Sequence, residues 1–443
     1  MFQRSRRLLA AAAATTAVAL MLSACGSPAT TTPAGTSSGN ATISFWTWNP
    51  DATTVKPYIA AFEASHPNIK VEHRYLQYSD YANTTQLALQ SGSGPDVFGL
   101  QVGVLTNQFA PLTEDLTPAI TKQLGKDWKS KLTATDQLAV NGKQVALPWM
   151  ITGGGLIWAN QTLVDSLKLT VPTNMAELKT FCAEVKKANK DCIVQGAKDS
   201  WQNIDVYQSI INQISPGLFY KALAGDADFS SPEFVKAFEV WKSFFTDGLF
   251  QEGALGMTAY PDAGDTFNKG QAALIVFGTW QNSNTTNAGM AQYAQTYGDA
   301  FDKNTVFMPY SFPQVVDGGT TGKLFGGPDV GFAVSSSSKS KEAAETFATW
   351  LSASDEGQKL MAKTVQQPVL SSVPLDLSDV KTPAQVAALK TQGPALKDMV
   401  GARQIQNADV NTALGDALSS VASGQQSAAQ AAAAVQAAIK ASK

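Results

Sequence analysis

Hydrophobic and polar positions alternate in two ways along the chain from residue 42 onward. Short apolar or every-other-residue runs at 42–46, 69–75 and 96–100 are typical of β-strands. Between them, apolar residues recur at helical spacing over 55–62 and 81–90. This strand–helix order predicts a parallel, doubly wound α/β sheet, in which ligands bind beyond the carboxyl ends of the strands.

The same kind of alternation continues toward the end of the chain. Asn141-Gly142 indicates a hairpin, and the sequence ends in a helical, alanine-rich tail. Further strands are expected at 153–158, 272–276, 304–308 and 330–334, and helices near 201–215, 232–247, 264–269 and 339–362. A chain of 443 residues is long enough for two or three such units, each with its own core.

Residues 1–24 have the pattern of an export signal, because three arginines precede an apolar run over 8–22. The following Leu22-Ser-Ala-Cys25 resembles a bacterial lipobox, which implies transfer of a diacylglyceryl group to Cys25 and cleavage before it. An ordinary signal peptide cut near Ala24 is the alternative, and the general secretory and twin-arginine routes both stay open.

Residues 25–40 follow the lipobox and consist of small, polar and proline residues after Cys25. Such a composition offers nothing to bury, so the segment is expected to form a flexible tether that carries the lipid. The globular body would then work close to the outer face of the cell membrane.

Charge and composition exclude several classes of function. The chain has 33 basic and 36 acidic residues, and three of the arginines lie in residues 1–24, so it has the wrong charge for a nucleic-acid-binding protein. Only His66 and His73 are present, which excludes a histidine-rich metal site, and we expect no metal and no other cofactor. Neither GxxxxGK[ST] nor HExxH occurs, and the one GxSxG match, Gly35-Thr-Ser-Ser-Gly39, lies in the segment of small and polar residues, so the sequence does not predict an enzyme.

Cys182 and Cys192 lie ten residues apart, without the CxxC spacing or neighbouring histidines of a metal or redox site. In an oxidising compartment outside the cell, this pair favours a structural disulfide.

Several motifs occur in one order along almost the whole mature chain. They are Ile43-Ser-Phe-Trp-Thr-Trp48, Gln90-Ser-Gly-Ser-Gly-Pro-Asp-Val-Phe98, Asn141-Gly-Lys-Gln-Val-Ala-Leu-Pro148, Gly155-Leu-Ile-Trp-Ala-Asn160, Phe267-Asn-Lys-Gly-Gln-Ala-Ala-Leu274, Gly278-Thr-Trp280, Gly326-Gly327, Gly331-Phe-Ala-Val334, Ser338-Lys-Ser-Lys-Glu-Ala-Ala-Glu-Thr-Phe347 and Ser420–Gln425 before the final helix. As an ordered set they resemble the extracellular solute-binding protein family 1 of ABC importers, which is similar to maltose- and oligosaccharide-binding lipoproteins. One departure is Pro172-Thr-Asn-Met-Ala-Glu-Leu178, which lacks the tryptophan that the family often has there.

The resemblance implies a periplasmic-binding-protein-like fold of type II, in which two doubly wound α/β lobes are joined by a hinge and enclose the ligand cleft. Mapped onto the chain, the first lobe takes residues 41–150 plus 306–362, and the second takes 151–305 plus 363–443. The resemblance also implies a non-enzymatic, extracytoplasmic lipoprotein that acts as a monomer, captures a di- or oligosaccharide and delivers it to the permease subunits of an ABC transporter.

A sugar-binding cleft needs aromatic rings for the C–H faces of the sugar, and amides, carboxylates or arginine for its hydroxyls. The loops that the family fold places beside the cleft supply twelve candidates: Trp48, Asn49, Asp96, Gln101, Trp149, Trp201, Asn203, Trp280, Gln281, Gly327, Asp329 and Arg403. Alternative interpretations stay open for several of them. Trp149 and Trp201 could pack in cores, Asp96 could cap the start of a strand, and Arg403 could be a surface charge.

Two other functions remain possible at this stage. The same fold could bind a non-sugar solute such as a glycerophosphodiester or a polyamine, although few arginines lie near the cleft motifs to hold phosphate. A secreted glycoside hydrolase would need only two carboxylates across a sugar cleft.

Overall fold

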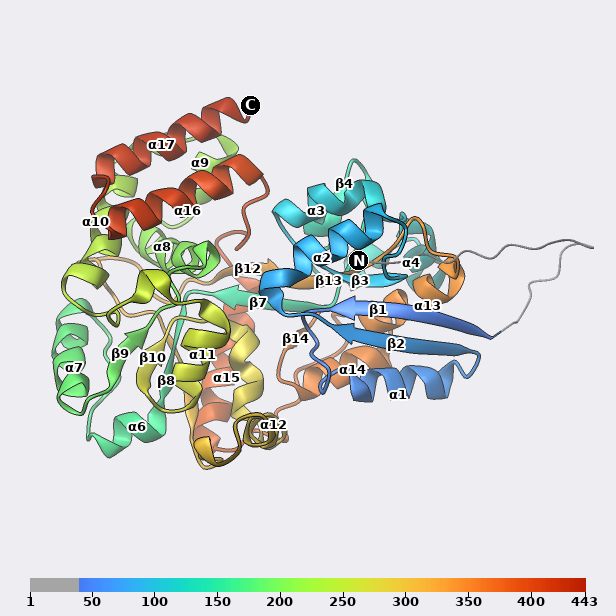
Figure 1. Ribbon diagram of the computed structural model, residues 1–443, viewed down its shortest axis with the longest axis horizontal. Coiled ribbons are helices and arrows are strands. Elements are labelled where there is room, and N and C mark those ends of the chain that lie inside the picture. Colours follow the sequence, from blue (N-terminus) through green and yellow to red (C-terminus); the bar gives the residue numbers. More distant parts are fainter. Residues whose placement is uncertain (1–39) are drawn as a thin grey trace, which may run out of the picture. The chain divides into compact units, whose positions relative to one another are not determined.

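The computed structural model describes residues Asn40–Lys443 (Figure 1). The expected signal peptide, Cys25 and the tether up to residue 39 lie outside the described residues. Within the described part, no helix is long and apolar enough to cross a membrane.

The first lobe is built on a five-stranded sheet. Its strand order is β2 (Ile69–Tyr75), β1 (Ala41–Thr47), β3 (Val97–Gln101), β13 (Val330–Val334) and β6 (Leu147–Pro148). As the alternating pattern predicts, β1 runs parallel to β2 and β3, whereas β13 runs antiparallel to β3 and β6. The helices of this lobe are α1 (Lys56–Ser65), α2 (Tyr78–Gln90), α3 (Val104–Phe109), α4 (Thr117–Leu124), α5 (Trp128–Lys131), α13 (Lys341–Ala353) and α14 (Asp355–Lys363).

The expected helix over 339–362 is divided into α13 and α14 at Ser354. The hydroxyl of Ser354 accepts a hydrogen bond from the Gly357 N–H at 2.9 Å and caps the start of α14. The predicted hairpin forms between β4 (Ala139–Val140) and β5 (Lys143–Gln144), and its turn contains Asn141-Gly142, both with positive φ.

The second lobe is built on a four-stranded sheet with the order β11 (Phe307–Ser311), β8 (Leu156–Asn160), β10 (Ala272–Ile275) and β9 (Asp191–Val194). Its helices are α6 (Gln161–Ser166), α7 (Met175–Lys187), α8 (Ser200–Ile214), α9 (Leu218–Ala224), α10 (Pro232–Thr246), α11 (Gly264–Asn268), α12 (Asn287–Tyr297), α15 (Pro383–Lys397), α16 (Ala408–Ala422) and α17 (Ala428–Ala441). The alanine-rich tail packs here, because Ala431, Ala432 and Val435 of α17 are fully buried in the core of this lobe.

A three-stranded antiparallel sheet joins the lobes, with β7 (Met150–Gly154) between β12 (Phe325–Pro328) and β14 (Gln367–Pro368). Figure 1 shows β7 and β12 running from one lobe to the other. The backbones approach closely at Gly326, where an added Cβ would lie only 2.0 Å from the carbonyl oxygen of Thr152. These strands form the connection that the family resemblance implies.

The structure differs from the expected lobe boundaries at two places. Residues 306–362 were assigned to the first lobe, yet β11 pairs antiparallel with β8 in the second sheet. Residues from 363 onward were assigned to the second lobe, yet Val369, Leu370 and Val373 pack in the core of the first. A short apolar run indicates a strand but not the sheet to which the strand belongs, and this explains the difference at β11.

The two cysteines are joined across α7 and β9. Cys182 and Cys192 form a disulfide with their Cα atoms 4.9 Å apart, and both residues are buried in the core of the second lobe. The bond connects a helix to the strand that follows it.

Candidate functional site

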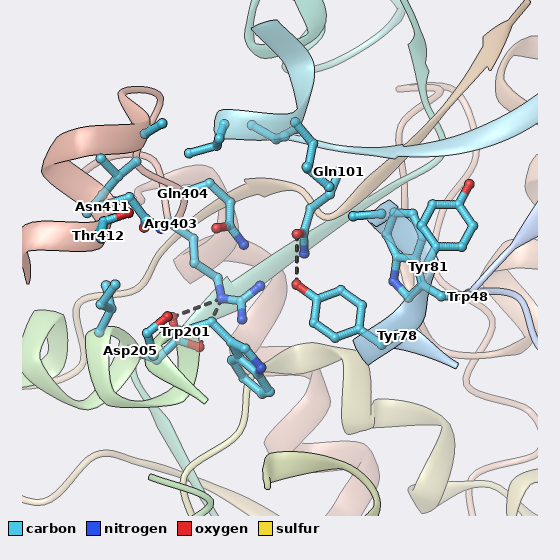
Figure 2. A pocket seen from close by; sticks show the side chains of 18 of the residues that line it. Trp48, Tyr78, Tyr81, Gln101, Trp201, Asp205, Arg403, Gln404, Asn411 and Thr412 are labelled. Carbon is cyan, nitrogen blue, oxygen red and sulfur yellow. Dashed lines mark hydrogen bonds and ion pairs between the residues drawn. The ribbon is translucent and has the colours of Figure 1, made fainter. Parts of the chain in front are cut away.

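A cavity of about 350 Å³ lies between the two lobes (Figure 2). Its lining comes from the ends of β1 and β3 and from α2 and α3 on the first lobe, and from α8, α16 and the segment before α16 on the second. The residues that line it are Trp48, Tyr78, Ser79, Tyr81, Ala82, Gln101, Val102, Val104, Leu105, Ser200, Trp201, Ile204, Asp205, Arg403, Gln404, Ile405, Ala408, Asn411 and Thr412. Because both lobes contribute, any relative motion of the lobes changes the shape of this site.

The first-lobe wall is aromatic and uncharged. Trp48 follows β1 and packs edge-on against Tyr81, with the ring centroids 4.6 Å apart. Tyr78, at the start of α2, donates its hydroxyl hydrogen to Oε1 of Gln101 at 2.8 Å. Burial raises the pKa of Tyr78 to about 12, although the positive charge of Arg403 acts against this shift. The hydroxyl therefore stays protonated at neutral pH and keeps the amide of Gln101 oriented.

The second-lobe wall carries a buried ion triad of Arg403, Asp205 and Asp329. The Nε–H of Arg403 lies 3.0 Å and 2.9 Å from the two carboxylate oxygens of Asp205, and Nη1 lies 3.2 Å from Oδ1 of Asp329. The Arg403 side chain is only 8% exposed and that of Asp205 only 5%. Since Asp205 lies on α8 and Asp329 between β12 and β13, the arginine connects the second lobe to the strands that join the lobes.

The guanidinium of Arg403 also lies against two indole rings. Its Cζ is 5.3 Å from the ring centroid of Trp201 and 4.3 Å from that of Trp280. A guanidinium at such distances is attracted by the negative faces of the rings. The guanidinium thus has two carboxylates and two aromatic rings as neighbours, and their attraction compensates for the hydration that it loses on burial.

Burial raises the pKa of Asp205 and of Asp329, and the positive charge of Arg403 acts in the opposite direction on both. The same two carboxylates hold the pKa of Arg403 above its usual value despite its burial. Among the residues that the structure describes, no cluster of three or more histidine, cysteine or acidic side chains could hold a metal ion. The chemistry available in the cavity is therefore aromatic contact and hydrogen bonding.

The lobes touch each other beside the cavity. An added Cβ at Gly103, which has a φ of +104°, would lie 2.9 Å from Cβ of Gln404 on the other lobe. Elsewhere, Nε2 of Gln292 donates to Oδ2 of Asp51 at 2.8 Å, also across the lobes. The structure therefore has the lobes in direct contact around the cavity.

Four of the residues expected at the site line the cavity, namely Trp48, Gln101, Trp201 and Arg403. Asp329 lies behind Arg403, and Trp280 lies under the guanidinium with its Nε1–H donated to the hydroxyl of Tyr260 at 3.0 Å. Gln281 is 4% exposed, and its Oε1 accepts from Nδ2 of Asn284 at 2.6 Å. None of these three residues lines the cavity.

Five other candidates lie away from the cavity lining. Trp149 is buried in the core of the first lobe beside Tyr58 and Phe332. Asn203 is fully buried and donates to the Ala197 carbonyl. Gly327 lies in β12, and Asn49 follows Trp48 outside the lining.

The fifth, Asp96, has its carboxylate fully engaged within the first lobe. One oxygen accepts from the N–H and the hydroxyl of Ser44 at 2.8 and 2.9 Å, and the other accepts from Ser338 at 2.6 Å. These contacts match the alternative interpretation in which the carboxylate ties the start of the strand to its neighbours.

Sequence reasoning did not nominate Tyr78, Asp205, Gln404, Asn411 and Thr412, all of which line the cavity. The spacing of Asp205 offered a signal, because it lies four residues after Trp201 and therefore on the same face of α8. Tyr78 and Tyr81 likewise share a face of α2. A polar residue four positions after a tryptophan of the site is therefore the sequence signal that indicates this part of the cavity wall.

Comparison with known proteins agrees with this architecture. Residues 46–359 match the family described as bacterial extracellular solute-binding protein. The galactooligosaccharide-binding protein of Bacillus subtilis (strain 168) is 25% identical over 377 residues, which cover 83% of this chain and 82% of the relative.

Two solved structures have the same fold. One, from work on xylan utilization by the thermophilic bacterium Caldanaerobius polysaccharolyticus, has a TM-score of 0.74 and 22% identity, covering 89% of this chain and 99% of the other. An ABC substrate-binding protein from Listeria monocytogenes in complex with cycloalternan has a TM-score of 0.69 and 20% identity, covering 91% and 99%. The two-lobed fold of type II periplasmic binding proteins is thus confirmed. Since the family match spans more than two thirds of the chain, this protein belongs to the bacterial extracellular solute-binding proteins, a family of binding proteins that act outside the cytoplasm.

Proposed function

We propose that this protein is the sugar receptor of an ABC importer, which captures a di- or oligosaccharide between its lobes and delivers it to the permease subunits. The observation that carries the proposal is the pairing of aromatic rings and hydrogen-bonding side chains in one interlobe cavity. Trp48 faces the cavity from the first lobe and Trp201 from the second (Figure 2). The relative from Bacillus subtilis is a galactooligosaccharide-binding protein, and the similar structure from Listeria monocytogenes is a complex with cycloalternan, so both support the same class of ligand.

The lining suits the two chemical faces of a sugar. An indole ring desolvates the C–H face of a pyranose, and its π-electrons attract the polarised hydrogens. Hydroxyls at the edge of the sugar need donors and acceptors, which Gln101, Gln404, Asn411 and Thr412 provide around the same cavity. Neither set alone would select a sugar.

The competing functions fit the cavity less well. A phosphodiester needs a cation with free charge, but Arg403 is already paired with Asp205 and Asp329. A glycoside hydrolase needs one carboxylic acid and one carboxylate free to act on the bond. Asp205 in the cavity lining and Asp329 behind it are instead bonded to the arginine, which supports binding without turnover.

The lipid anchor is part of the proposal. The lipobox-like sequence that ends in Cys25 supports a lipoprotein held on the outer face of the cell membrane by residues 25–40. Replacing Cys25 with Ser should release the protein into the medium or leave an uncleaved precursor. A variant that stays in the membrane fraction at the mature mass would contradict the anchor. Light scattering of the soluble, lipid-free chain should give the mass of a monomer.

A sugar panel tests the ligand class directly. A ligand that binds only the native state raises the melting temperature in proportion to RT ln(1 + [L]/Kd), so a thermal-shift screen followed by calorimetry identifies it. Trp48→Ala should then weaken binding by about tenfold or more, since a buried aromatic contact is worth about 1.5–3 kcal/mol.

Trp46→Ala is the matched control. Trp46 lies two residues before Trp48, has the same size and packs under Arg74 instead of lining the cavity. We expect its Kd to stay within about twofold of the wild type, a change of less than 0.5 kcal/mol. No sugar binding in the panel, or release of a cleaved sugar, would refute the proposed function.

A further inference from the structure

The cavity wall has an unusual balance of charge. Among the described residues that line the cavity, Arg403 is the single cationic side chain, and it contacts two carboxylates, Asp205 in the lining and Asp329 behind it. One positive charge therefore meets two negative charges in a part of the protein with little solvent. No other acidic side chain lines this cavity within the described residues.

We propose that this triad makes the cleft a filter against anions, so that it accepts uncharged sugars and rejects sugars that carry a carboxylate or a phosphate. In this proposal Asp329 is a specificity-determining residue although it does not line the cavity. The inference rests on the proposed function and names the charge class of its ligand.

The geometry lets Arg403 serve a ligand as a hydrogen-bond donor without attracting anions. Its Nε and Nη1 are occupied by the two carboxylates, whereas Nη2 makes no hydrogen bond to any of the described residues. Figure 2 shows the guanidinium end pointing toward the space between Trp201 and Tyr78. The free N–H groups can donate to a sugar hydroxyl, because a hydroxyl needs no net positive charge beside it.

For an anionic sugar, the electrostatic interaction energy at the same position is unfavourable. A carboxylate brought next to Arg403 would also lie close to Asp205 and within reach of the charge of Asp329. Charges that are shielded from water interact strongly over such distances and are weakly screened by salt. The repulsion of the ligand by two carboxylates then exceeds its attraction to one guanidinium. An arginine without carboxylate partners would instead attract the anionic sugar.

A purely structural role for the triad makes a different prediction. If Asp205 and Asp329 only hold Arg403 in place, their replacement changes stability and affects neutral and acidic sugars alike. If the triad is a filter, removing one negative charge changes the ratio of the two affinities. The ratio, and not the stability, is therefore the measurement that separates the two roles.

The experiment uses the soluble mature chain and a matched pair of ligands in calorimetry. The pair is the best neutral disaccharide of the sugar panel with its uronic-acid counterpart, for example α-1,4-galactobiose with digalacturonate. We expect the wild type to prefer the neutral sugar by at least about a hundredfold, a difference of about 2.7 kcal/mol. Asp329→Asn should reduce this preference by about tenfold or more, mainly through tighter binding of the uronate, because one repelling charge is gone.

Three further variants keep the test decisive. Asp205→Asn, measured alongside, provides the same loss of charge if Asp329→Asn does not fold. Asp329→Glu retains the charge and should retain the preference. Asp226→Asn removes an equal charge at an exposed position outside the cavity lining and should leave the preference unchanged.

Two results would overturn the inference alone. One is a wild type that binds the uronate as well as the neutral sugar, and the other is an unchanged preference in both Asp→Asn variants. If no neutral sugar binds to the wild type at all, the proposed function fails and the inference fails with it.

Discussion

The two walls of the interlobe cavity solve the same recognition task with different chemistry. The first-lobe wall is uncharged, and its Trp48, Tyr78 and Gln101 come from the ends of strands and the first turn of α2. The second-lobe wall contains the buried Asp205 and Arg403, which come from a helix and from the segment before α16. One wall is built from neutral contacts and the other from ions that depend on each other.

The difference has consequences for stability. The transfer of neutral aromatic and amide groups from water into the protein costs little free energy, provided that their hydrogen bonds are made. The desolvation of an ion costs far more free energy, so a buried charge is tolerated only as long as its partners are present. We therefore expect the second-lobe wall to be sensitive to single substitutions that remove a charge, and the first-lobe wall to be tolerant of small changes.

The largest expected effect is that of Arg403→Met. Methionine fills similar space, but it leaves Asp205 and Asp329 buried without a partner, and breaking a buried pair in this way costs about 3–5 kcal/mol. Urea denaturation should show that loss in the free energy of unfolding. Arg74→Met is the control, because Arg74 is exposed on the first lobe over Trp46 and should contribute less than about 1 kcal/mol. Equal effects of the two variants would contradict the contrast between the walls.

The second expected effect concerns the cross-link in the second lobe. The disulfide between Cys182 and Cys192 closes a loop with a sequence separation of 10, and a loop of that size contributes about 2–3 kcal/mol by restricting the unfolded chain. The double variant Cys182→Ala/Cys192→Ala should lose that amount in equilibrium denaturation without a change in sugar affinity.

Peptide mapping under non-reducing conditions checks the bond itself. It should yield one linked pair of peptides that contain Cys182 and Cys192. Two free thiols in an oxidised preparation would contradict it.

The contrast between the walls also explains what the sequence could predict. The first wall follows from strand periodicity, because a side chain just past a parallel strand lies at the ligand edge of the sheet, and Trp48 and Gln101 were named for that reason. The second wall depends on which face of α8 turns inward, a question that the hydrophobic pattern of this helix leaves open because nearly all of its residues are buried. Asp205 was therefore missed.

Other misplacements have the same physical origin. Trp149 was expected on one of the loops that the family fold places beside the cleft, but its place in the sequence determines only where the backbone lies and not where the side chain points. The side chain packs against Tyr58 and Phe332 in the core of the first lobe. The sequence also could not predict which sheet β11 joins, because its pairing partner β8 lies far away in the sequence and such pairing leaves no local pattern. Local patterns thus predicted the elements well and the direction of individual side chains poorly.

The third prediction compares two tryptophans of the second lobe. Trp201 lines the cavity, whereas Trp280 lies under Arg403 and donates its Nε1–H to Tyr260. Trp201→Ala should weaken sugar binding by about tenfold or more, because it removes a ligand contact of about 1.5 kcal/mol or more. Trp280→Ala should weaken it less, through the loss of one aromatic neighbour that is worth about 0.5–1 kcal/mol to the guanidinium. Calorimetry with the sugar from the panel measures both, and the reverse order would show that Trp280 is the contact.

The smallest expected effect is on the pH dependence of the free energy of unfolding, to which His73 in the first lobe and Asp205 in the second contribute with opposite signs. Burial lowers the pKa of His73 in the first lobe to about 4, with Asp51 acting against the shift. Burial raises the pKa of Asp205 in the second lobe. The free energy of unfolding rises with pH wherever the unfolded chain binds more protons. His73 therefore makes stability increase as pH rises from about 4 toward 6.5, while Asp205 makes it decrease as pH rises above the pKa of an ordinary carboxyl group.

Burial disfavours the protonated ring of His73, and the contacts of the ring show which nitrogen would bind the proton. Its Nε2 lies 2.6 Å from the hydroxyl of Thr47, which donates its own hydrogen to the Pro50 carbonyl at 2.7 Å, so Nε2 must be the donor and Nδ1 carries the free lone pair. His73→Gln can still donate to Thr47 but cannot titrate. Because the ring is partly open to solvent, which weakens the effect of burial, we expect the wild type to lose only about 1 kcal/mol more than His73→Gln between pH 6.5 and 4.5. Urea denaturation at both pH values measures the difference, and parallel losses in the two proteins would show that His73 does not contribute to the pH dependence of the first lobe.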